Sequence, residues 1–196
     1  MIRVVNARTF RTVCGGIVLC LTACLLSACH CACRSIRAQE SLSRDRRVLL
    51  AFPFFPDGSD QCGPSALASV LGYWGKPESP ARLKQDLYQE RLKGSLTVDL
   101  LLSAEQRGMY AEMFNGDLDR IRRELDAGRP LIAFVNTGFR FYPVGHYLVI
   151  TGYDDGLRCV FAHSGLKRDK KISYKKLDRQ WEKTERWALL ILPSRP

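Results

Sequence analysis

The sequence predicts an α+β domain in which helices from the first half pack on an antiparallel sheet formed by the second half. Between about residues 62 and 128, apolar residues recur at helical spacing. After Pro130 the pattern changes to short runs of branched and aromatic residues, which turn signals separate. Helices first and strands later along the chain are typical of the α+β class.

The composition indicates one folded domain with a short N-terminal appendage. The chain has 196 residues, and 46% of them are hydrophobic and 26% charged, which excludes a disordered or fibrous protein. The net charge is +10, but much of the excess lies before residue 48, so we expect no nucleic-acid partner. Of the 8 cysteines only Cys62 and Cys159 lie beyond residue 33, so the domain holds at most one disulfide bond.

The first 28 residues predict an export signal. Three arginines within residues 1–11 precede an apolar run over residues 13–28, which is shorter than the roughly 20 residues that cross a bilayer. The run ends in Leu26-Ser27-Ala28-Cys29, which resembles the lipobox of bacterial lipoproteins, where the cysteine is lipidated and becomes the new N-terminus. We therefore expect a signal peptide over residues 1–28 and a basic tether over residues 29–48 that begins at lipidated Cys29.

The lipobox resemblance implies a lipoprotein of the bacterial cell envelope that is held at a membrane by acyl chains and faces the periplasm. Because His30 rather than Asp follows Cys29, the outer membrane is favoured. Two other interpretations stay open: a plain signal peptide or signal anchor, and a metal cluster of Cys29, His30, Cys31 and Cys33. The spacing of these four residues is tighter than in usual zinc sites. We expect no metal and no organic cofactor.

The folded domain is expected over residues 49–196. It begins with an extended segment, because two prolines interrupt the apolar run Ala51–Pro56, and a turn over Asp57–Asp60 follows. Helices are recognised by proline in the first turn, a capping side chain before it and glycine after the last turn. These signals predict a helix from Pro64 to about Trp74 and a second helix that Ser79-Pro80 opens and that buries Leu83, Leu87 and Leu92. They also predict helices from a cap at Thr97 to Gly108 and from Asn115–Asp117 to Gly128.

Strands are expected after Pro130, with a short helix before the last of them. The expected strands are Leu131–Val135, His146–Thr151, Leu157–Ala162 and Trp187–Leu192, and the expected helix is Lys176–Lys183. The charged run Lys167–Lys171 is interpreted as a solvated turn between strands rather than as a binding patch. The sequence contains no repeat, phosphate-binding loop or dinucleotide fingerprint.

Cys62 and His146 are the residues that indicate chemistry. Cys62 stands in the segment Gln61–Leu67, at the first turn of a helix, where the positive end of the helix dipole favours a thiolate nucleophile. Its base must come from another element, and His146 opens an apolar strand directly after Gly145. The other interpretations are a buried structural thiol at Cys62, a disulfide bond between Cys62 and Cys159, and a core histidine at residue 146.

The Cys-Gly-Pro helix start at Cys62 and the Gly-His strand start at His146 resemble the bacteriocin-processing (double-glycine) cysteine peptidase family, which has a papain-like fold. The similarity also includes Phe54–Pro56, Gly94-Ser95-Leu96 and Trp187-Ala188-Leu189, and spans about residues 50–193. In particular, the chain is similar to a standalone bacterial subgroup of secreted or lipidated proteins. The resemblance implies that Cys62 is the nucleophile and that His146 is the general base and acid.

Two supporting positions differ from the pattern of that family. Where the family has a glutamine that donates to the oxyanion, this sequence has Asp57, and Gln61 is the other candidate. Where the family has an Asp-Pro pair, this sequence has Ser164 between a histidine and a glycine, so Ser164 is a candidate for orienting His146. Asn136 is a further candidate, because an asparagine has that role in papain.

The resemblance therefore implies a membrane-anchored papain-like cysteine peptidase that acts on a peptide or protein substrate, and we expect a monomer. Two alternatives follow from the same residues. A catalytically silent domain of this fold would bind a peptide or leader for an envelope or export partner. An acyltransferase would use the same cysteine and histidine with a different acceptor.

Overall fold

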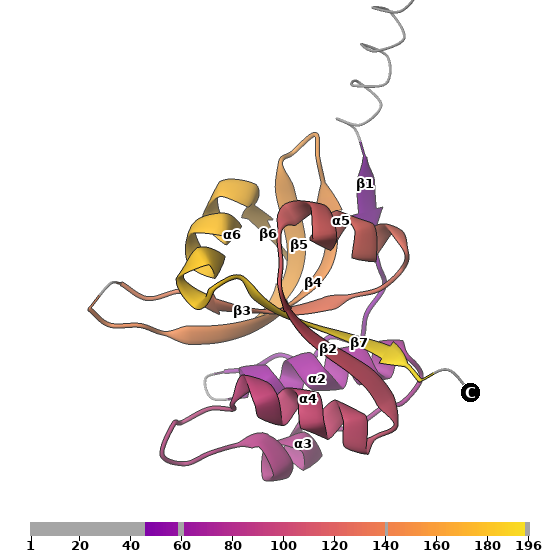
Figure 1. Ribbon diagram of the computed structural model, residues 1–196, viewed down its shortest axis with the longest axis vertical. Coiled ribbons are helices and arrows are strands. Elements are labelled where there is room, and N and C mark those ends of the chain that lie inside the picture. Colours follow the sequence, from indigo (N-terminus) through magenta and orange to yellow (C-terminus); the bar gives the residue numbers. More distant parts are fainter. Residues whose placement is uncertain (1–45, 59–60, 140, 195–196) are drawn as a thin grey trace, which may run out of the picture. The chain divides into compact units, whose positions relative to one another are not determined.

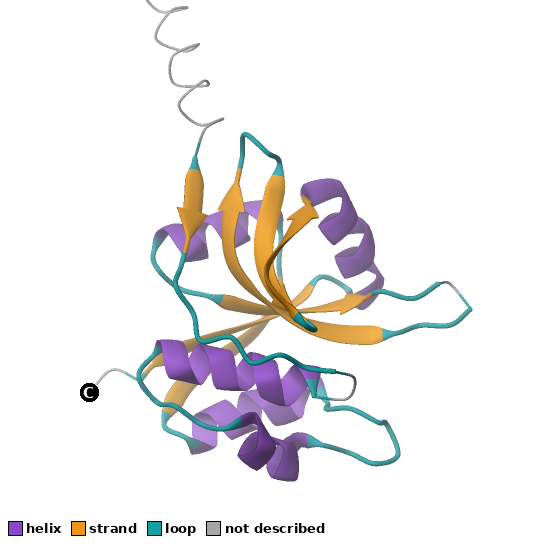
Figure 2. Cartoon of the chain, turned by 180° about the vertical axis from the view of Figure 1, so that it is seen from behind, coloured by secondary structure: helices purple, strands orange, loops and turns teal. Residues whose placement is uncertain are grey.

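An antiparallel sheet of seven strands lies between two groups of helices (Figure 1, Figure 2). The computed structural model describes residues 46–58, 61–139 and 141–194. The expected signal peptide, the lipidation site at Cys29 and most of the tether lie outside the described residues. Within these three ranges, every helix is too short or too polar to cross a lipid bilayer.

The folded unit begins at Arg46, slightly before the boundary at residue 49 that the sequence predicts, because β1 pairs with the end of β4. The helices are α2 (Cys62–Tyr73), α3 (Pro80–Leu87), α4 (Thr97–Gln106), α5 (Leu118–Asp126), α6 (Tyr174–Trp181) and the 3-10 helix η1 (Glu182–Thr184). The strands are β1 (Arg47–Leu49), β2 (Met109–Asn115), β3 (Leu131–Asn136), β4 (Gly145–Asp154), β5 (Cys159–Ser164), β6 (Lys167–Ser173) and β7 (Trp187–Pro193). The order across the sheet is β2-β7-β3-β4-β5-β6.

Local interactions determine where most helices begin and end, as the sequence predicts. Ser79 accepts a hydrogen bond from the backbone of Arg82 at the start of α3, and Asp117 accepts one from the backbone of Arg120 at the start of α5. Glycines with positive φ angles follow three helices: Gly75 after α2, Gly108 after α4 and Gly128 after α5. The α+β class and the positions of four helices in the first half are thereby confirmed.

Two expectations about helix ends are wrong. Thr97 is the first residue of α4 rather than its cap, and Leu96 precedes it without a side-chain hydrogen bond to the helix. The α3 helix ends before Leu92, which is 55% exposed instead of buried. The chain leaves α3 in an extended conformation because Gln89 pairs with Gly94 and closes a short loop.

The four predicted strands correspond to β3, β4, β5 and β7, and the predicted short helix corresponds to α6. The sequence does not predict β1, β2 or β6. The segment Lys167–Ser173 forms β6, which corrects the interpretation of Lys167–Lys171 as a turn. This strand lies at the edge of the sheet, pairs only with β5 and fully buries only Ile172, so its charged side chains keep their contact with water.

The sheet is buried on both faces. Along β4, Tyr147 and Val149 pack with α2, α3 and α4, whereas Leu148 and Ile150 pack with α5 and α6. Trp181 is buried in the second of these cores. The helices of the first half thus cover one face of the sheet, as predicted, and the first residues of β4 lie beside the start of α2.

Candidate active site

Cys62 is the first residue of α2, and its neighbours hold this helix start against the loop between α3 and α4. A Cβ atom on Gly63 would come within 2.9 Å of the Ser95 Oγ atom, so glycine permits this close approach. Pro64 lies in the first turn, where the helix does not need its missing N–H group. The half-buried thiol of Cys62 and the buried thiol of Cys159 are both free, so the interpretation as a disulfide bond is wrong.

His146 and Ser164 meet on neighbouring strands. His146 is the second residue of β4 and Ser164 is the last residue of β5, and these two strands pair antiparallel. The Nε2 atom of His146 and the Oγ atom of Ser164 are 3.0 Å apart and share a hydrogen bond. Of the two sequence candidates for a partner of this imidazole, the structure places Ser164 beside it.

Asn136 and Gln61 lie away from this pair. The Oδ1 atom of Asn136 accepts hydrogen bonds from the backbone amides of Gly138 and Val144, at 2.9 and 3.0 Å, and closes the base of the β3–β4 hairpin. The suggestion that Asn136 orients the histidine is therefore not supported. Gln61 precedes α2, does not cap it with its side chain, and does not line the pocket next to the cysteine.

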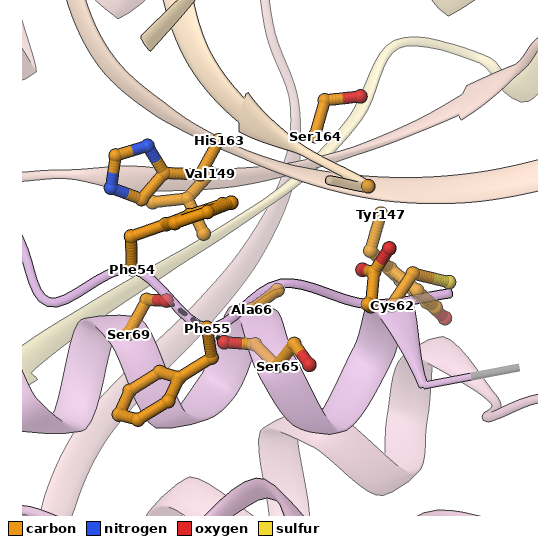
Figure 3. Close-up of a pocket in the computed structure, with 12 residues that line it drawn as sticks. Phe54, Phe55, Cys62, Ser65, Ala66, Ser69, Tyr147, Val149, His163 and Ser164 are labelled. Carbon is orange, nitrogen blue, oxygen red and sulfur yellow. Dashed lines mark hydrogen bonds between the residues drawn. The ribbon is translucent and has the colours of Figure 1, made fainter. Parts of the chain in front are cut away.

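The start of β4 connects the two candidate catalytic residues, because it carries His146 and its next residue, Tyr147, lies beside Cys62. The backbone of Tyr147, the residue after His146, lies close enough to the sulfur of Cys62 to lower the pKa of the thiol. The Tyr147 hydroxyl donates to the carbonyl oxygen of Ser95 at 3.0 Å and holds the α3–α4 loop beside them. Figure 3 shows Cys62 and Tyr147 side by side. Sequence reasoning did not identify Tyr147, because neither a backbone contact nor a hydroxyl contact with a distant loop leaves a signal in the sequence.

A narrow pocket lies beside Cys62, between α2, the extended segment over residues 50–58 and the strands β4 and β5 (Figure 3). Its cavity volume is about 10 Å³, which is room for roughly one water molecule. Asp57, Cys62 and Ser164 supply polar groups to its wall. The backbone amide of Asp57 donates to the carbonyl oxygen of Gly165 at 3.2 Å, which holds the carboxyl group at the pocket.

His163 lines the same pocket but lies at the opposite end from Cys62 (Figure 3). Its ring is buried against the edges of Phe52 and Phe54, and its Nδ1 atom accepts a hydrogen bond from the backbone of Asp169 at 3.2 Å. Burial lowers the pKa of His163. This histidine therefore links β6 to the extended segment. Among the described residues, no group of three or more His, Cys, Asp or Glu side chains could hold a metal ion.

The electrostatic surroundings favour the neutral forms of both candidate catalytic groups. Burial raises the pKa of the Cys62 thiol, and the charge of Asp57 adds to this rise, while backbone hydrogen bonds from Tyr147 and the helix start lower it. Burial and the charge of Lys170 lower the pKa of His146. The helix start predicts a stabilised thiolate, but burial raises the pKa of the thiol more than the nearby backbone N–H groups lower it.

A cysteine at the start of a helix that packs on an antiparallel sheet, with a histidine at the end of a strand in that sheet, is the arrangement of the papain-like cysteine peptidases. The chain belongs to the Peptidase_C39 like family, whose profile matches residues 39–189. This confirms the family resemblance that the sequence shows. No curated protein matches the sequence.

Several solved peptidase domains have the same fold. A double glycine motif protease from an AMS/PCAT transporter, crystallised in complex with the leader peptide, gives a TM-score of 0.61 at 21% identity, over 75% of this chain and 95% of that one. The peptidase domain of Streptococcus ComA, a bifunctional ABC transporter of a quorum sensing pathway, gives 0.60 at 20% identity, over 75% and 98%. A protein from Bacillus anthracis described as C39-like gives 0.60 at 18% identity, over 78% and 100%. At these identities the likeness shows the fold.

Proposed function

We propose that this protein is a papain-like cysteine peptidase in which Cys62 attacks a peptide carbonyl and His146 transfers the proton. The proposal rests on one observation: a short stretch of β4 contacts the Cys62 thiol and also holds the His146 imidazole. The backbone of Tyr147 lies beside the Cys62 sulfur, and the side chain of His146 shares a hydrogen bond with Ser164. Membership of the family supports a papain-like cysteine peptidase or a related domain.

Ser164 occupies the Nε2 atom of His146, so Nδ1 is the nitrogen left to act as the base. With Nε2–H donating to the serine Oγ atom, the lone pair lies on Nδ1, and this nitrogen takes the thiol proton. Because thiol and imidazole are both neutral, the proton moves as the Cys62 sulfur bonds to the carbonyl carbon. The imidazolium then protonates the leaving amine. Water attacks the acyl-enzyme as it gives a proton to His146, and the imidazolium returns this proton to the departing Cys62 sulfur.

The carbonyl oxygen becomes an oxyanion that needs hydrogen-bond donors. The Cys62 backbone amide lies at the start of α2, where N–H groups have no partner within the helix. Asp57 lines the same pocket, and burial raises the pKa of its carboxyl group. The protonated carboxyl group donates a hydrogen bond, whereas the ionised group repels an oxyanion. We therefore assign Asp57 rather than Gln61 to the oxyanion site.

A second candidate function is peptide binding without catalysis, and two positions favour it. Asp57 donates a hydrogen bond to an oxyanion only when it is protonated, whereas a neutral amide would donate at every pH. Ser164 bonds to His146 without a negative charge that would stabilise the imidazolium. Such a protein would hold a peptide or leader for an envelope or export partner. An acyltransferase would use the same two groups and differ only in the acceptor of the acyl group.

Cleavage of a peptide mixture by the full-length chain distinguishes these functions. We expect the parent protein and Cys159→Ala to cleave the same peptides, because Cys159 lies at the far end of β5 from Ser164. Cys62→Ala should keep the melting temperature of the parent and lose cleavage. Retained cleavage in Cys62→Ala overturns the assignment. Tight peptide binding by the parent without any cleavage favours the silent binding domain.

The location is also part of the proposal: the protein is anchored through acyl chains on Cys29 and faces the periplasm. The support is the sequence Leu26–Cys29 at the end of the apolar run. Metabolic labelling of cells with an alkyne fatty acid tests it, with Cys31→Ser as a matched control for Cys29→Ser. We expect label on the full-length chain and on the control, and none on Cys29→Ser. Label on Cys29→Ser contradicts the anchor.

A further inference from the structure

Three lysines gather on the histidine side of the candidate site. In the β5–β6 register, Ser164, the hydrogen-bond partner of the histidine, lies opposite Lys167. Ile172 of β6 is buried in the core that α6 covers, and Lys170, two residues away on the same strand, therefore faces the same side of the sheet. Lys176 belongs to α6 itself. We call these three residues the lysine cluster.

The members of the lysine cluster act on one another and on the histidine. Burial and the positive charges of Lys176 and Lys167 lower the pKa of Lys170, and the charge of Lys170 lowers the pKa of His146. No carboxylate within the described residues forms an ion pair with the cluster. Asp169, which lies between two of the lysines on β6, bonds instead to a threonine of β4 at 2.9 Å. The positive charge of the cluster is thus uncompensated.

The position of the lysine cluster indicates what it binds. In acyl transfer by a thiol and an imidazole, the histidine gives its proton to the leaving amine. The substrate segment that follows the scissile bond therefore passes the histidine side of the site. Lys170 is partly buried, Lys167 and Lys176 are exposed, and clustered cations without an acidic partner in the protein favour binding of carboxylates.

We propose that the lysine cluster binds carboxylates on the substrate segment that follows the scissile bond, so that the site selects peptides that are acidic on this side. The proposal rests on the proposed peptidase function and adds a substrate class to it. It also replaces the interpretation of Lys167–Lys171 as a run without a binding role.

Binding of matched peptides to the full-length chain tests the proposal. The background is Cys62→Ala, so that binding is measured without cleavage. Three amidated peptides share one sequence before the cleavage point and carry Glu, Gln or Lys at the positions after it, and a fourth is the Gln peptide with a free C-terminal carboxylate. The test variant is Lys167→Gln/Lys170→Gln. The matched control, Lys171→Gln/Lys175→Gln, has the same net charge, with one change on the opposite face of β6 and one on α6.

At low ionic strength we expect the Glu peptide to bind roughly tenfold more tightly than the Gln peptide. The preference should fall to about twofold in Lys167→Gln/Lys170→Gln, remain in the control, and shrink in high salt because salt screens exposed charges. If only the Gln peptide with the free C-terminal carboxylate binds more tightly, the cluster is still a carboxylate site. The carboxylate that it binds is then the substrate C-terminus. Equal binding of all peptides, or equal losses in both double variants, overturns the proposal.

Cleavage by the same full-length chain with Cys62 present separates this proposal from the proposed function. Cleavage without any preference for acidic peptides retains the peptidase and overturns the lysine site. A second outcome is that the protein binds acidic peptides more tightly, that Lys167→Gln/Lys170→Gln abolishes this preference, and that no peptide is cleaved. This outcome supports the lysine site and overturns the peptidase.

Discussion

The cysteine side and the histidine side of the candidate site carry charges of opposite sign, and both charges act against ionisation of the pair. On the cysteine side the charge of Asp57 raises the pKa of the thiol, in the same direction as burial. On the histidine side the charge of Lys170 lowers the pKa of the imidazole, again in the same direction as burial. A thiolate–imidazolium pair would be stabilised by the reverse arrangement, with a cation near the sulfur and an anion near the ring.

This difference indicates how a substrate could activate the pair. A carboxylate bound at the lysine cluster would compensate the charge of Lys170 and raise the pKa of His146. Protonation of Asp57 would remove the negative charge that raises the pKa of Cys62. Both changes make transfer of the thiol proton to the imidazole easier, so the free protein is expected to be less reactive than the substrate complex. Variants on each side of the site separate the two contributions.

Removal of the base is expected to have the largest effect. His146→Ala should lower kcat/KM for a cleaved peptide by about 10²- to 10⁴-fold, the range for a general acid–base group. The matched control is His163→Gln, which changes the buried histidine at the far end of the same pocket. We expect this control to lower the melting temperature and to retain cleavage. Equal loss of activity in both variants would contradict the assignment of His146 as the base.

Changing the hydrogen-bond partner of the base is expected to have a smaller effect. Ser164→Ala should lower kcat by about tenfold, because one hydrogen bond that orients the imidazole is lost. Ser164→Asp should raise the pKa of His146, since a negative charge then faces its Nε2 atom. Because only neutral imidazole acts as the base, the acidic limb of the pH–rate profile should move to higher pH. An unchanged profile in Ser164→Asp would show that this position does not contact the ring during catalysis.

On the cysteine side, Asp57→Asn should raise activity several-fold above neutral pH. Burial raises the pKa of Asp57, and only its protonated form donates to the oxyanion, so parental activity should fall as rising pH ionises this group. An asparagine amide donates at every pH and removes the charge that raises the thiol pKa. The measurement is kcat/KM from pH 4 to 9, together with the rate of Cys62 alkylation. Loss of activity in Asp57→Asn across this whole pH range would contradict the assignment of Asp57 to the oxyanion site.

The smallest expected effect is a pH shift in Lys170→Gln, measured with a substrate that has no acidic residues. Loss of this charge should raise the pKa of His146, so protonation inactivates the base at a higher pH and the acidic limb moves upward. Lys171→Gln, on the opposite face of the same strand, should leave the limb in place. A shift of equal size in both variants would indicate an effect of net charge rather than of the lysine cluster.

The parts of the molecule that the sequence predicts are those that local interactions determine. The caps at Ser79 and Asp117, and the glycines after three helices, act within one turn of the residues they order. Four strands of branched and aromatic residues were predicted because both faces of the sheet are buried. The placement of Cys62 at a helix start and of His146 at a strand start follows from the same local patterns.

The supporting residues of the site could not be predicted in this way. Ser164 rather than Asn136 meets the imidazole because β5, and not the hairpin between β3 and β4, brings a polar side chain to the ring. The edge strand β6 has the composition of a solvated turn, and only its pairing with β5 makes it a strand. Its lysines therefore reach the histidine side through a pairing that their own sequence does not indicate.

The sequence by itself determined the α+β class, the family, most helix boundaries and the candidate pair Cys62 and His146. Short-range propensity, capping and motif spacing are properties of neighbouring residues. Only the tertiary structure decided that Ser164 is the partner of the imidazole, that Asp57 and Lys170 lie on opposite sides of the pair, and that both groups favour their neutral forms. The physical reason is that burial and electrostatic potential at a titrating atom depend on groups far away in the chain, which only the folded sheet and α2 bring together.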